Sequence, residues 1–335
     1  MAIETTFRAL ADNTRLRILR LVGSMELAVG EIAQVLGQSQ PRVSRHIGIL
    51  ASAGLAERRR EGSWVFLRAA AAGDHATPLR QAIAAMLECA EQEDSDFARA
   101  CVQDRQRLAA IRSTREQQAA AYFAAHAHDW DELRRMHTSD EQVETALAQA
   151  LDTQGLGRLL DIGTGTGRMA ELFARSADHI VALDKSLAML RVARAKLQHL
   201  PTDHVELVQG DFAGLPFADA VFDTVLFHQV LHFAPDPAAA LAEAGRVLRP
   251  GGRVAIVDFA AHQREELREK HAHARLGFRD DQMAGFLVDA GFVASDPQAL
   301  EGGELVVKIW VCARLDAHPA RSDNARSDNE RKVAS

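Results

Sequence analysis

The sequence is poor in the residues that build disulfide-linked or membrane-embedded proteins. Only three of its 335 residues are cysteine, namely Cys89, Cys101 and Cys312, and no two of them form a CxxC pair. No stretch approaches the roughly 18 uninterrupted apolar residues of a transmembrane helix. The first ten residues lack the basic and apolar layout of a secretory signal. These absences exclude a disulfide framework and favour a cytoplasmic protein with no membrane partner.

An overall excess of positive charge is also lacking, because the net charge of the chain is −7. The charge is unevenly distributed, however. Residues 1–73 carry ten arginines and six carboxylates, a net charge of +4, which leaves −11 for residues 74–335. This asymmetry is expected when one module faces nucleic-acid phosphates and the other does not. The chain length favours two domains and a connector.

The first 72 residues have the pattern of a winged helix-turn-helix domain. Apolar spacing predicts helices at 13–22 and 29–36, and a glycine stop then precedes a third helix that opens at 38–41. Residues 56–60 and 64–67 flank a Glu-Gly-Ser turn and predict a two-stranded hairpin, the wing. A helix, turn, helix and wing of this kind predicts DNA binding.

The third helix is the candidate recognition helix. Val43, Ile47 and Leu50 have the i, i+4, i+7 spacing of a core-facing stripe, so their neighbours should point outward toward a DNA groove. Arginine and glutamine can bind base edges, and the wing arginines suit phosphates or the minor groove, although three consecutive arginines can also form a solvated face. The predicted DNA-binding residues are Gln40, Arg42, Ser44 and Arg45 in the helix and Arg58, Arg59 and Arg60 in the wing.

Residues 73–150 are rich in alanine and charge and predict a helical connector. An apolar stripe recurs there at spacings of three, four or seven residues and consists of Leu79, Ile83, Met86, Ala90, Phe97 and Cys101. Such a stripe packs either on a partner subunit or on its own domain, and of the two we favour dimerisation. Residues 316–335 contain Ala-Arg-Ser-Asp-Asn twice in tandem and predict a disordered tail.

Residues 151–315 alternate apolar, strand-like runs with helical patterns, which is typical of a doubly wound α/β sheet. The predicted strands are Leu159–Ile162, Ile180–Leu183, Val205–Val208, Val221–Phe227 and Val254–Phe259. The first strand runs into Gly163, Gly165 and Gly167, where the backbone can approach a nucleotide without a Cβ collision. A plain tight turn is the alternative. A dinucleotide site with G-x-G-x-x-G is disfavoured, because Arg168 occupies the position of its third glycine.

Two aspartates follow the next strands along the chain. Asp184 ends the second strand, at about the 20-residue offset expected for a carboxylate that binds ribose hydroxyls. Asp211 follows the third strand. Each aspartate alone is more often a helix cap or a turn residue. Because the carboxyl ends of parallel strands meet at one edge of the sheet, where open α/β folds bind ligands, we expect all three strand ends to form one site.

The glycine loop resembles that of class I S-adenosylmethionine-dependent methyltransferases, in which an acidic residue precedes G-x-G-x-G. The resemblance continues through 184–190, 210–217, 222–232 and 246–252, so that it covers about half of the chain. It implies a Rossmann-like fold and S-adenosyl-L-methionine as the cofactor. The cofactor-binding residues that it implies are Asp161, Gly163, Gly165, Gly167, Asp184, Lys185, Asp211, Phe212 and His228.

The N-terminal domain resembles ArsR-type winged-helix repressors over residues 7–19, 39–46 and 50–55. That resemblance implies a homodimer that binds operator DNA. Many such repressors sense metals through cysteines in the helix before the turn, whereas residues 26–36 contain none. A second polar cluster also lacks metal-site spacing and consists of Asp74, His75, Glu88 and Cys89. No metal site is predicted.

Methyl transfer chiefly requires alignment, because the cofactor supplies the reactivity, and a base matters only if the acceptor loses a proton. His228, His232 and Asp258 lie at or after strand ends and are the candidate catalytic residues, although histidines there are more often surface or capping residues. The segment after the fourth strand lacks the Asn/Asp-Pro-Pro-Tyr motif of base-amino methyltransferases, and no Pro-Cys pair occurs. A DNA base is therefore disfavoured, and an unidentified small molecule is the expected acceptor.

The whole-chain pattern resembles the fusion of an ArsR-type regulator, residues 1–72, with a class I methyltransferase domain, residues 151–315. We expect a transcriptional regulator whose second domain binds S-adenosylmethionine or S-adenosylhomocysteine and either transfers methyl groups or senses the cofactor. One alternative is a small-molecule methyltransferase that autoregulates its own gene. Another is a metal- or metalloid-responsive repressor, which Cys89 and Cys101 alone motivate.

Overall fold

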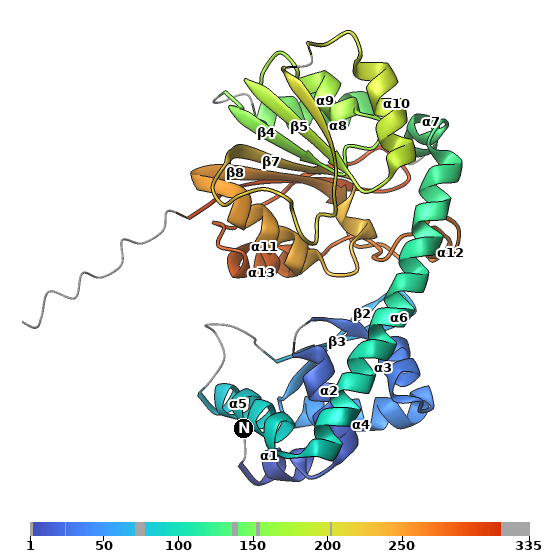
Figure 1. Cartoon of the computed structure of the whole chain (residues 1–335), viewed down its shortest axis with the longest axis vertical. Coiled ribbons are helices and arrows are strands. Elements are labelled where there is room, and N and C mark those ends of the chain that lie inside the picture. The colour runs from blue at the N-terminus through green and yellow to red at the C-terminus, as the bar shows by residue number, and fades with distance from the viewer. Residues whose placement is uncertain are drawn as a thin grey trace, which may run out of the picture.

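The computed structural model describes residues 3–23, 25–70, 78–135, 140–151, 155–201 and 203–315. One long helix, α6, joins an N-terminal part to a C-terminal α/β domain (Figure 1). We call residues 3–93 the head and residues 140–315 the body. The tail predicted at 316–335 lies outside the described residues.

The head contains the predicted winged helix-turn-helix. Its elements are α1 (Ile3–Leu10), α2 (Asn13–Val22), β1 (Leu27–Ala28), α3 (Val29–Leu36), α4 (Gln40–Ser52), β2 (Ala56–Glu61), β3 (Trp64–Ala69) and α5 (Pro78–Glu93). The three strands form an antiparallel sheet in the order β1-β3-β2. The predicted helices and hairpin are confirmed. Strand β1 was not predicted, because two residues are too few to show an alternating pattern.

The turn between α3 and α4 depends on Gly37. Its φ of +63° lies in the left-handed region, and its N–H donates to the carbonyl of Gln34 at the end of α3. The chain reverses there and enters α4. As predicted, Val43, Ile47 and Leu50 are at most 1% exposed and pack in the core of the head. The opposite face of α4 is thereby left to solvent.

The connector begins by packing on its own head. Helix α6 (Ser95–His126) follows α5, and Ile83, Leu87, Phe97 and Cys101 are buried in the same hydrophobic cluster as α2 and α4. Most of the predicted stripe is therefore used within the chain, whereas Met86 is exposed. Two short bonds from Arg17 to the Asp104 carboxylate, of 2.7 and 2.6 Å, also attach α6 to α2.

The body contains a seven-stranded sheet in the order β6-β5-β4-β7-β8-β10-β9. Strands β4 to β8 pair in parallel, whereas β10 is antiparallel to both β8 and β9. Its strands are β4 (Arg158–Ile162), β5 (His179–Asp184), β6 (Val205–Gln209), β7 (Phe222–His228), β8 (Leu248–Phe259), β9 (Gln298–Leu300) and β10 (Val307–Ala313). The five predicted strands and the α/β class are confirmed, and the antiparallel strands β9 and β10 were not predicted.

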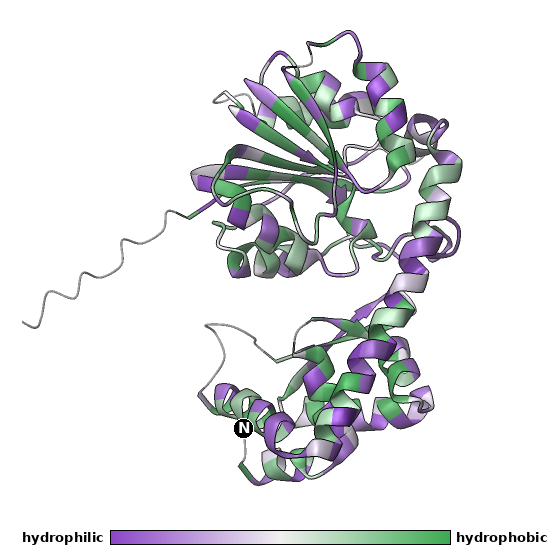
Figure 2. Cartoon of the chain, in the orientation of Figure 1, coloured by the Kyte–Doolittle hydropathy of each residue, from purple (hydrophilic) through white to green (hydrophobic). Residues whose placement is uncertain are grey.

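Helices cover both faces of this sheet (Figure 1). They are α7 (Trp130–Arg135), α8 (Asp140–Leu151), α9 (Arg168–Phe173), α10 (Leu187–Leu197), the short 3-10 helix η1 (Leu231–Phe233), α11 (Pro237–Val247), α12 (Glu266–Lys270) and α13 (Asp280–Asp289). Leu160 and Ile162 pack with α11 and α13, whereas Leu159 packs with α8 and α9. Apolar residues accordingly fill the central strands (Figure 2). Burial on both faces explains why these strands appear as uninterrupted apolar runs.

No helix in the described ranges is long and apolar enough to cross a membrane.

Two glycines of the head offer a matched test of backbone conformation. A Cβ added to either Gly48, inside α4, or Gly37 would meet no atom within 4 Å, but only Gly37 has a positive φ. Gly48→Ala should stabilise the protein by about 0.5–1 kcal/mol, because glycine costs that much inside a helix. Gly37→Ala should destabilise it by about 1–2 kcal/mol. Urea unfolding of the two variants measures both effects, and shifts of the same sign would show that backbone conformation does not distinguish the two positions.

Candidate functional site: a cavity between the body and the head

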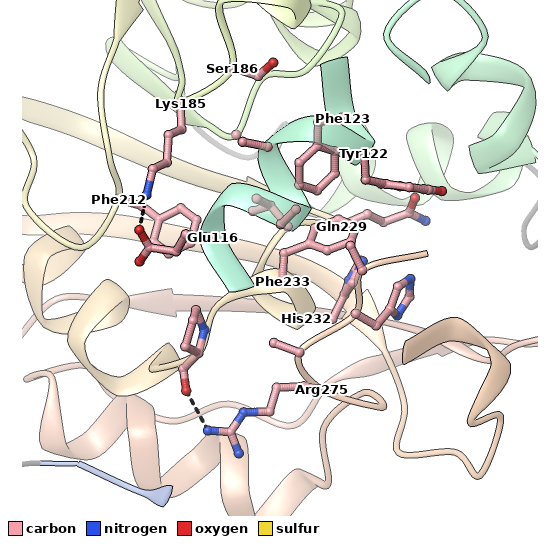
Figure 3. Close-up of a pocket in the computed structure, with 18 of the residues that line it drawn as sticks. Glu116, Tyr122, Phe123, Lys185, Ser186, Phe212, Gln229, His232, Phe233 and Arg275 are labelled. Atoms are coloured by element: carbon pink, nitrogen blue, oxygen red, sulfur yellow. Dashed lines mark hydrogen bonds and ion pairs between the residues drawn. The ribbon is translucent and has the colours of Figure 1, made fainter. Parts of the chain in front are cut away.

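A cavity of about 710 Å³ lies where the body, the C-terminal half of α6 and the wing meet (Figure 3). That volume is typical of small-molecule sites, for which about 300–1,000 Å³ is usual. The predicted cofactor residues that line it are Asp161, Gly163, Gly165, Asp184, Lys185, Asp211, Phe212 and His228. The folded chain thus brings together the ends of β4, β5 and β7 and the loop after β6.

The glycine loop closes one end of the cavity. Gly163, Gly165 and Gly167 have φ values of +69°, +56° and +82°, which side chains rarely adopt. A Cβ on Gly163 would lie only 2.3 Å from the Val230 side chain, so this position must be glycine. Gly167 does not line the cavity. It precedes α9, and a Cβ there would meet Leu197 at 2.8 Å, which gives this glycine a packing role.

The carboxylate of Asp184 is held at the end of β5 by the backbone. It accepts hydrogen bonds from the N–H groups of Gly165, at 2.8 Å, and Ser186, at 2.7 Å. Burial raises the pKa of Asp184, although these bonds and one from the N–H of Lys185 oppose the shift. Each carboxylate oxygen retains lone-pair capacity for a further donor. The side chain can therefore accept hydroxyl groups from a ligand in the cavity.

The loops after β5 and β6 are joined by an ion pair. Lys185 Nζ lies 2.7 Å from Asp211 Oδ2. It also lies 3.3 Å from Glu116 Oε2 of α6, and Figure 3 labels Lys185 and Glu116. Burial alone would raise the pKa of Asp211, but the hydrogen bonds from Lys185 and the N–H of Ala213, together with the charge of Lys185, lower that pKa. Lys185 therefore links the loop after β5 to the loop after β6 and to α6. Its ammonium group is paired with carboxylates of the protein.

Two of the three catalytic candidates form a buried pair. His232, in η1, places its Nδ1 2.8 Å from Asp258 Oδ1 at the end of β8, and Asp258 also accepts from the N–H of His232 and of Phe259. A carboxylate that accepts all these bonds favours the His232 tautomer with hydrogen on Nδ1, which leaves Nε2 as a proton acceptor. His232 lines the cavity (Figure 3). His228, the third candidate, ends β7 and also lines it.

Residues of the connector also contribute to the site. The sequence analysis did not predict these residues. The indole of Trp130 lies 3.6 Å from a Cβ built on Gly165, and Asp131 Oδ1 accepts from Thr166 Oγ1 at 2.7 Å. Tyr122 Oη lies 2.8 Å from His271 Nδ1 of the body. The available signal was composition, because Tyr122, Phe123 and Trp130 are aromatic residues in a stretch otherwise rich in alanine and charge.

The predicted recognition face is exposed. Gln40, Arg42, Ser44 and Arg45 all lie on the solvent side of α4, and Arg58 and Arg60 are exposed on β2. Arg59 requires a correction. Its guanidinium binds Glu26 and Glu61 and has a side-chain exposure of only 18%, so in this structure it does not present a phosphate contact. Residues alternate between the two faces of a strand, which places Arg59 opposite Arg58 and Arg60.

Arg59 belongs to an interdomain ion-pair cluster that joins the wing to the body. The cluster consists of Glu26, Arg59 and Glu61 from the head and Arg268 and Arg275 from the body. Arg275 lies 2.7 Å from Glu26, and Arg268 lies 2.5 Å from Glu61. Burial alone would raise the pKa of Glu26, but hydrogen bonds from Arg59 and the charge of Arg275 outweigh it and lower that pKa. The carboxylate is therefore held in its charged form.

Backbone groups add to this contact between wing and body. Glu61 Oε1 accepts from the N–H of Leu276 at 2.6 Å, and the N–H of Ser63 at the tip of the wing donates to Glu265 at 2.6 Å. The wing thus makes directional bonds to the body through both side chains and main chain.

The described residues give no support to metal sensing. No group of three or more potential ligands that could hold a metal lies within them. Cys101 is buried in the core of the head, and burial raises the pKa of its thiol, which disfavours the thiolate that binds metals. Asp74 and His75 lie outside the described ranges.

Comparisons with known proteins match the two parts separately. Residues 12–58 match the bacterial regulatory protein, arsR family, and residues 160–256 match a methyltransferase domain. The chain is 38% identical over 122 residues to a demethylmenaquinone methyltransferase of Clavibacter sepedonicus, an alignment that covers 36% of this chain and 49% of the relative. It is 31% identical over 177 residues to an uncharacterized 37.1 kDa protein in transposon TN4556 of Streptomyces fradiae, with coverage of 48% and 51%.

The chain therefore spans about half the length of these curated relatives. Among solved structures, a chain in the complex between the Haloferax volcanii Trm112 methyltransferase activator and a methyltransferase is 21% identical. That match covers 60% of this chain and 99% of the other, with a TM-score of 0.51. The predicted combination is confirmed: an arsR-type helix-turn-helix is fused to a Rossmann-like methyltransferase domain, a type of domain that binds S-adenosylmethionine.

Removing the charge of Glu61 should release the wing from the body. Glu61→Gln takes one partner from a buried ion pair, which costs about 3–5 kcal/mol. Hydrogen exchange measured by mass spectrometry should therefore accelerate at least about a hundredfold in the wing and around Leu276, since 1.4 kcal/mol corresponds to a factor of ten. Glu57→Gln is the matched control, because Glu57 pairs with Arg68 on the exposed face of the same hairpin. Equal protection in both variants would refute the role assigned to Glu61.

Proposed function

We propose that this protein is a transcriptional regulator whose DNA affinity depends on whether S-adenosylmethionine or S-adenosylhomocysteine fills the cavity. The observation that carries the proposal is the position of α6. Its first half packs in the core of the head, and its second half forms a wall of the cofactor cavity. A ligand that changes this wall therefore acts on the element to which the DNA-binding head is attached.

The residues of the cavity fit the cofactor. The glycine loop provides backbone without side chains at the end of β4, and the Asp184 carboxylate can accept the ribose hydroxyls. We assign the adenine to Phe212 and Asp211, which line the cavity after β6. When bound, S-adenosylmethionine supplies a methyl group on a sulfonium sulfur that is reactive toward nucleophiles.

The His232–Asp258 pair supports methyl transfer as a second activity of the same site. His232 Nε2 can take a proton from an acceptor hydroxyl, while Asp258 stabilises the resulting positive charge. The rings of Phe233 and Phe259 lie beside His232, with centroids 4.0 and 5.0 Å from that of its imidazole. A small-molecule methyl acceptor is compatible with this arrangement. Sensing of the cofactor requires only that it binds, and no methyl transfer.

DNA binding is assigned to the exposed face of α4, together with Arg58 and Arg60. Arginine and glutamine at these positions suit base edges in the major groove and phosphates. We further propose a homodimer, because a single helix offers a small interface and ArsR-type repressors bind two half-sites. A cofactor that tightens or loosens the contact between wing and body would change how the wing meets DNA.

The decisive experiment measures binding of the full-length protein to its own upstream DNA at one salt concentration. It compares protein alone, with S-adenosylmethionine and with S-adenosylhomocysteine. We expect the affinity to shift about 5- to 150-fold, the usual range for coupled sites. Fixed salt is essential, since phosphate contacts make affinity steeply salt-dependent. Tight DNA binding that ignores both ligands would refute the sensor proposal.

Asp184→Asn tests the cofactor assignment. The amide cannot accept from both backbone N–H groups and from ribose hydroxyls at once, so affinity for S-adenosylhomocysteine should fall at least about tenfold, as expected for lost bonds to a charged acceptor. Isothermal titration calorimetry measures the affinity. The control is Asp178→Asn, an exposed carboxylate just before the same strand. Unchanged affinity in Asp184→Asn would show that the ribose assignment is wrong.

A further inference from the structure

Aromatic residues are scarce in this chain but concentrate around the cavity. The cavity wall includes the only tyrosine, two of the three tryptophans and five of the fourteen phenylalanines. Trp64 and Phe66 come from the wing, and the others come from the connector and the body. The cavity therefore continues beyond the predicted cofactor residues to the face between the two domains.

One face of α6 runs from the cofactor end of the cavity to the end next to the wing. Arg112, Arg115, Ala119, Tyr122 and Phe123 all line the cavity and recur at intervals of three or four residues, or one position apart, along that face. From Arg112 to Phe123 the helix rises about 16 Å, at 1.5 Å per residue. A wall of that length can serve a second ligand beside the cofactor.

The aromatic rings of the cavity wall contact one another from the cofactor loop toward the wing. Phe123 meets Phe233 edge-to-face, with ring centroids 4.9 Å apart, and it meets Trp130 in the same manner at 5.4 Å. Trp64, at the wing, lies under the guanidinium of Arg268 at 4.6 Å. Planar aromatic ligands gain most from such surfaces, because rings stack or meet edge-to-face. Figure 3 labels Tyr122, Phe123 and Phe233 among the residues that line the cavity.

Arg112 is the polar residue that indicates which ligand this end of the cavity favours. Of the arginines that line the cavity, it alone has no ion-pair or hydrogen-bond partner among the described residues, and its Nε is buried. Burial lowers the pKa of its guanidinium, although the charges of Glu31, Asp236 and Glu116 oppose the shift. An unpaired, partly desolvated cation is costly, so this position favours an anionic partner.

The neighbouring carboxylates are already engaged. Glu31 binds Arg115, Glu116 binds Lys185, and Asp236 accepts from the N–H of Ala239 at the start of α11. A carboxylate brought by a ligand would give Arg112 the direct partner that none of these three carboxylates provides in the described residues.

We propose that the end of the cavity next to the wing binds a planar aromatic carboxylate, whose carboxylate pairs with Arg112 and whose ring lies against Trp64 and the aromatic residues of α6. This inference concerns a site beyond the cofactor residues. Only the effect of the ligand on the DNA-binding head rests on the proposed function. Because the ligand contacts the wing and the body together, its binding favours the docked arrangement and carries a chemical signal to the head.

The probe is 2-naphthoate, compared by calorimetry with its neutral analogue 2-naphthamide in the absence of cofactor. The full-length protein should bind the acid at least about tenfold more tightly, since a bond between charged groups accounts for such a difference. Arg112→Gln should abolish the preference for the acid. Arg99→Gln, an exposed position on the same helix, should keep it. Absence of binding, equal affinity for both probes, or a preference that survives Arg112→Gln would overturn the proposal.

Two further measurements locate the ligand and exclude a structural role for Arg112. Trp64→Leu should weaken 2-naphthoate about threefold to tenfold and leave the affinity for S-adenosylhomocysteine unchanged. Competition between the two ligands, with no effect of Trp64→Leu, would place the probe at the cofactor end and overturn the proposal. Free Arg112→Gln protein should melt at or above the wild-type temperature, and a clearly lower melting temperature would show that Arg112 stabilises the fold instead.

The same titrations separate this proposal from the proposed function. Binding of 2-naphthoate without any effect of S-adenosylhomocysteine on DNA affinity would refute only the cofactor sensor. A cofactor effect on DNA without 2-naphthoate binding would refute only the aromatic-acid site.

Discussion

The geometry of the whole molecule depends on one continuous helix, α6, that is fixed at both ends. At its head end Asp104 binds Arg17 through two short bonds, and at its body end Tyr122 bonds His271. Each backbone N–H inside a helix bonds the carbonyl four residues earlier, so 32 residues act as one stiff element. The position of the head and the shape of the cofactor cavity therefore cannot vary independently.

The wing is bound to the body in this structure. A winged helix can contact DNA through this hairpin, yet here its tip and its inward-facing side chains bind the body. Glu61 and Arg275 are at most 3% exposed at their side chains, so the pairs lie in a low-dielectric environment where each charge needs its partner. On the proposed assignment of the wing to DNA, DNA and the body would compete for the same hairpin.

The cavity combines local and remote contributions in a similar way. The glycine loop and the strand ends arise from neighbouring residues, and they suffice to define a nucleotide site. The cover over that site comes from Trp130 and Asp131, which belong to the connector. The cofactor loop is thus covered by residues of α7, which follows α6 along the chain.

The sequence by itself determined the elements whose signals are local. Periodicity revealed the helices of the head and the five parallel strands, and glycine spacing located the cofactor loop, because backbone preference and burial act over a few residues. It could not determine the role of Arg59, the pairing of His232 with Asp258, or the aromatic cover of the cavity. Glu61 and Arg268 stand 207 positions apart, and only the folded chain decides which distant charges share one buried space.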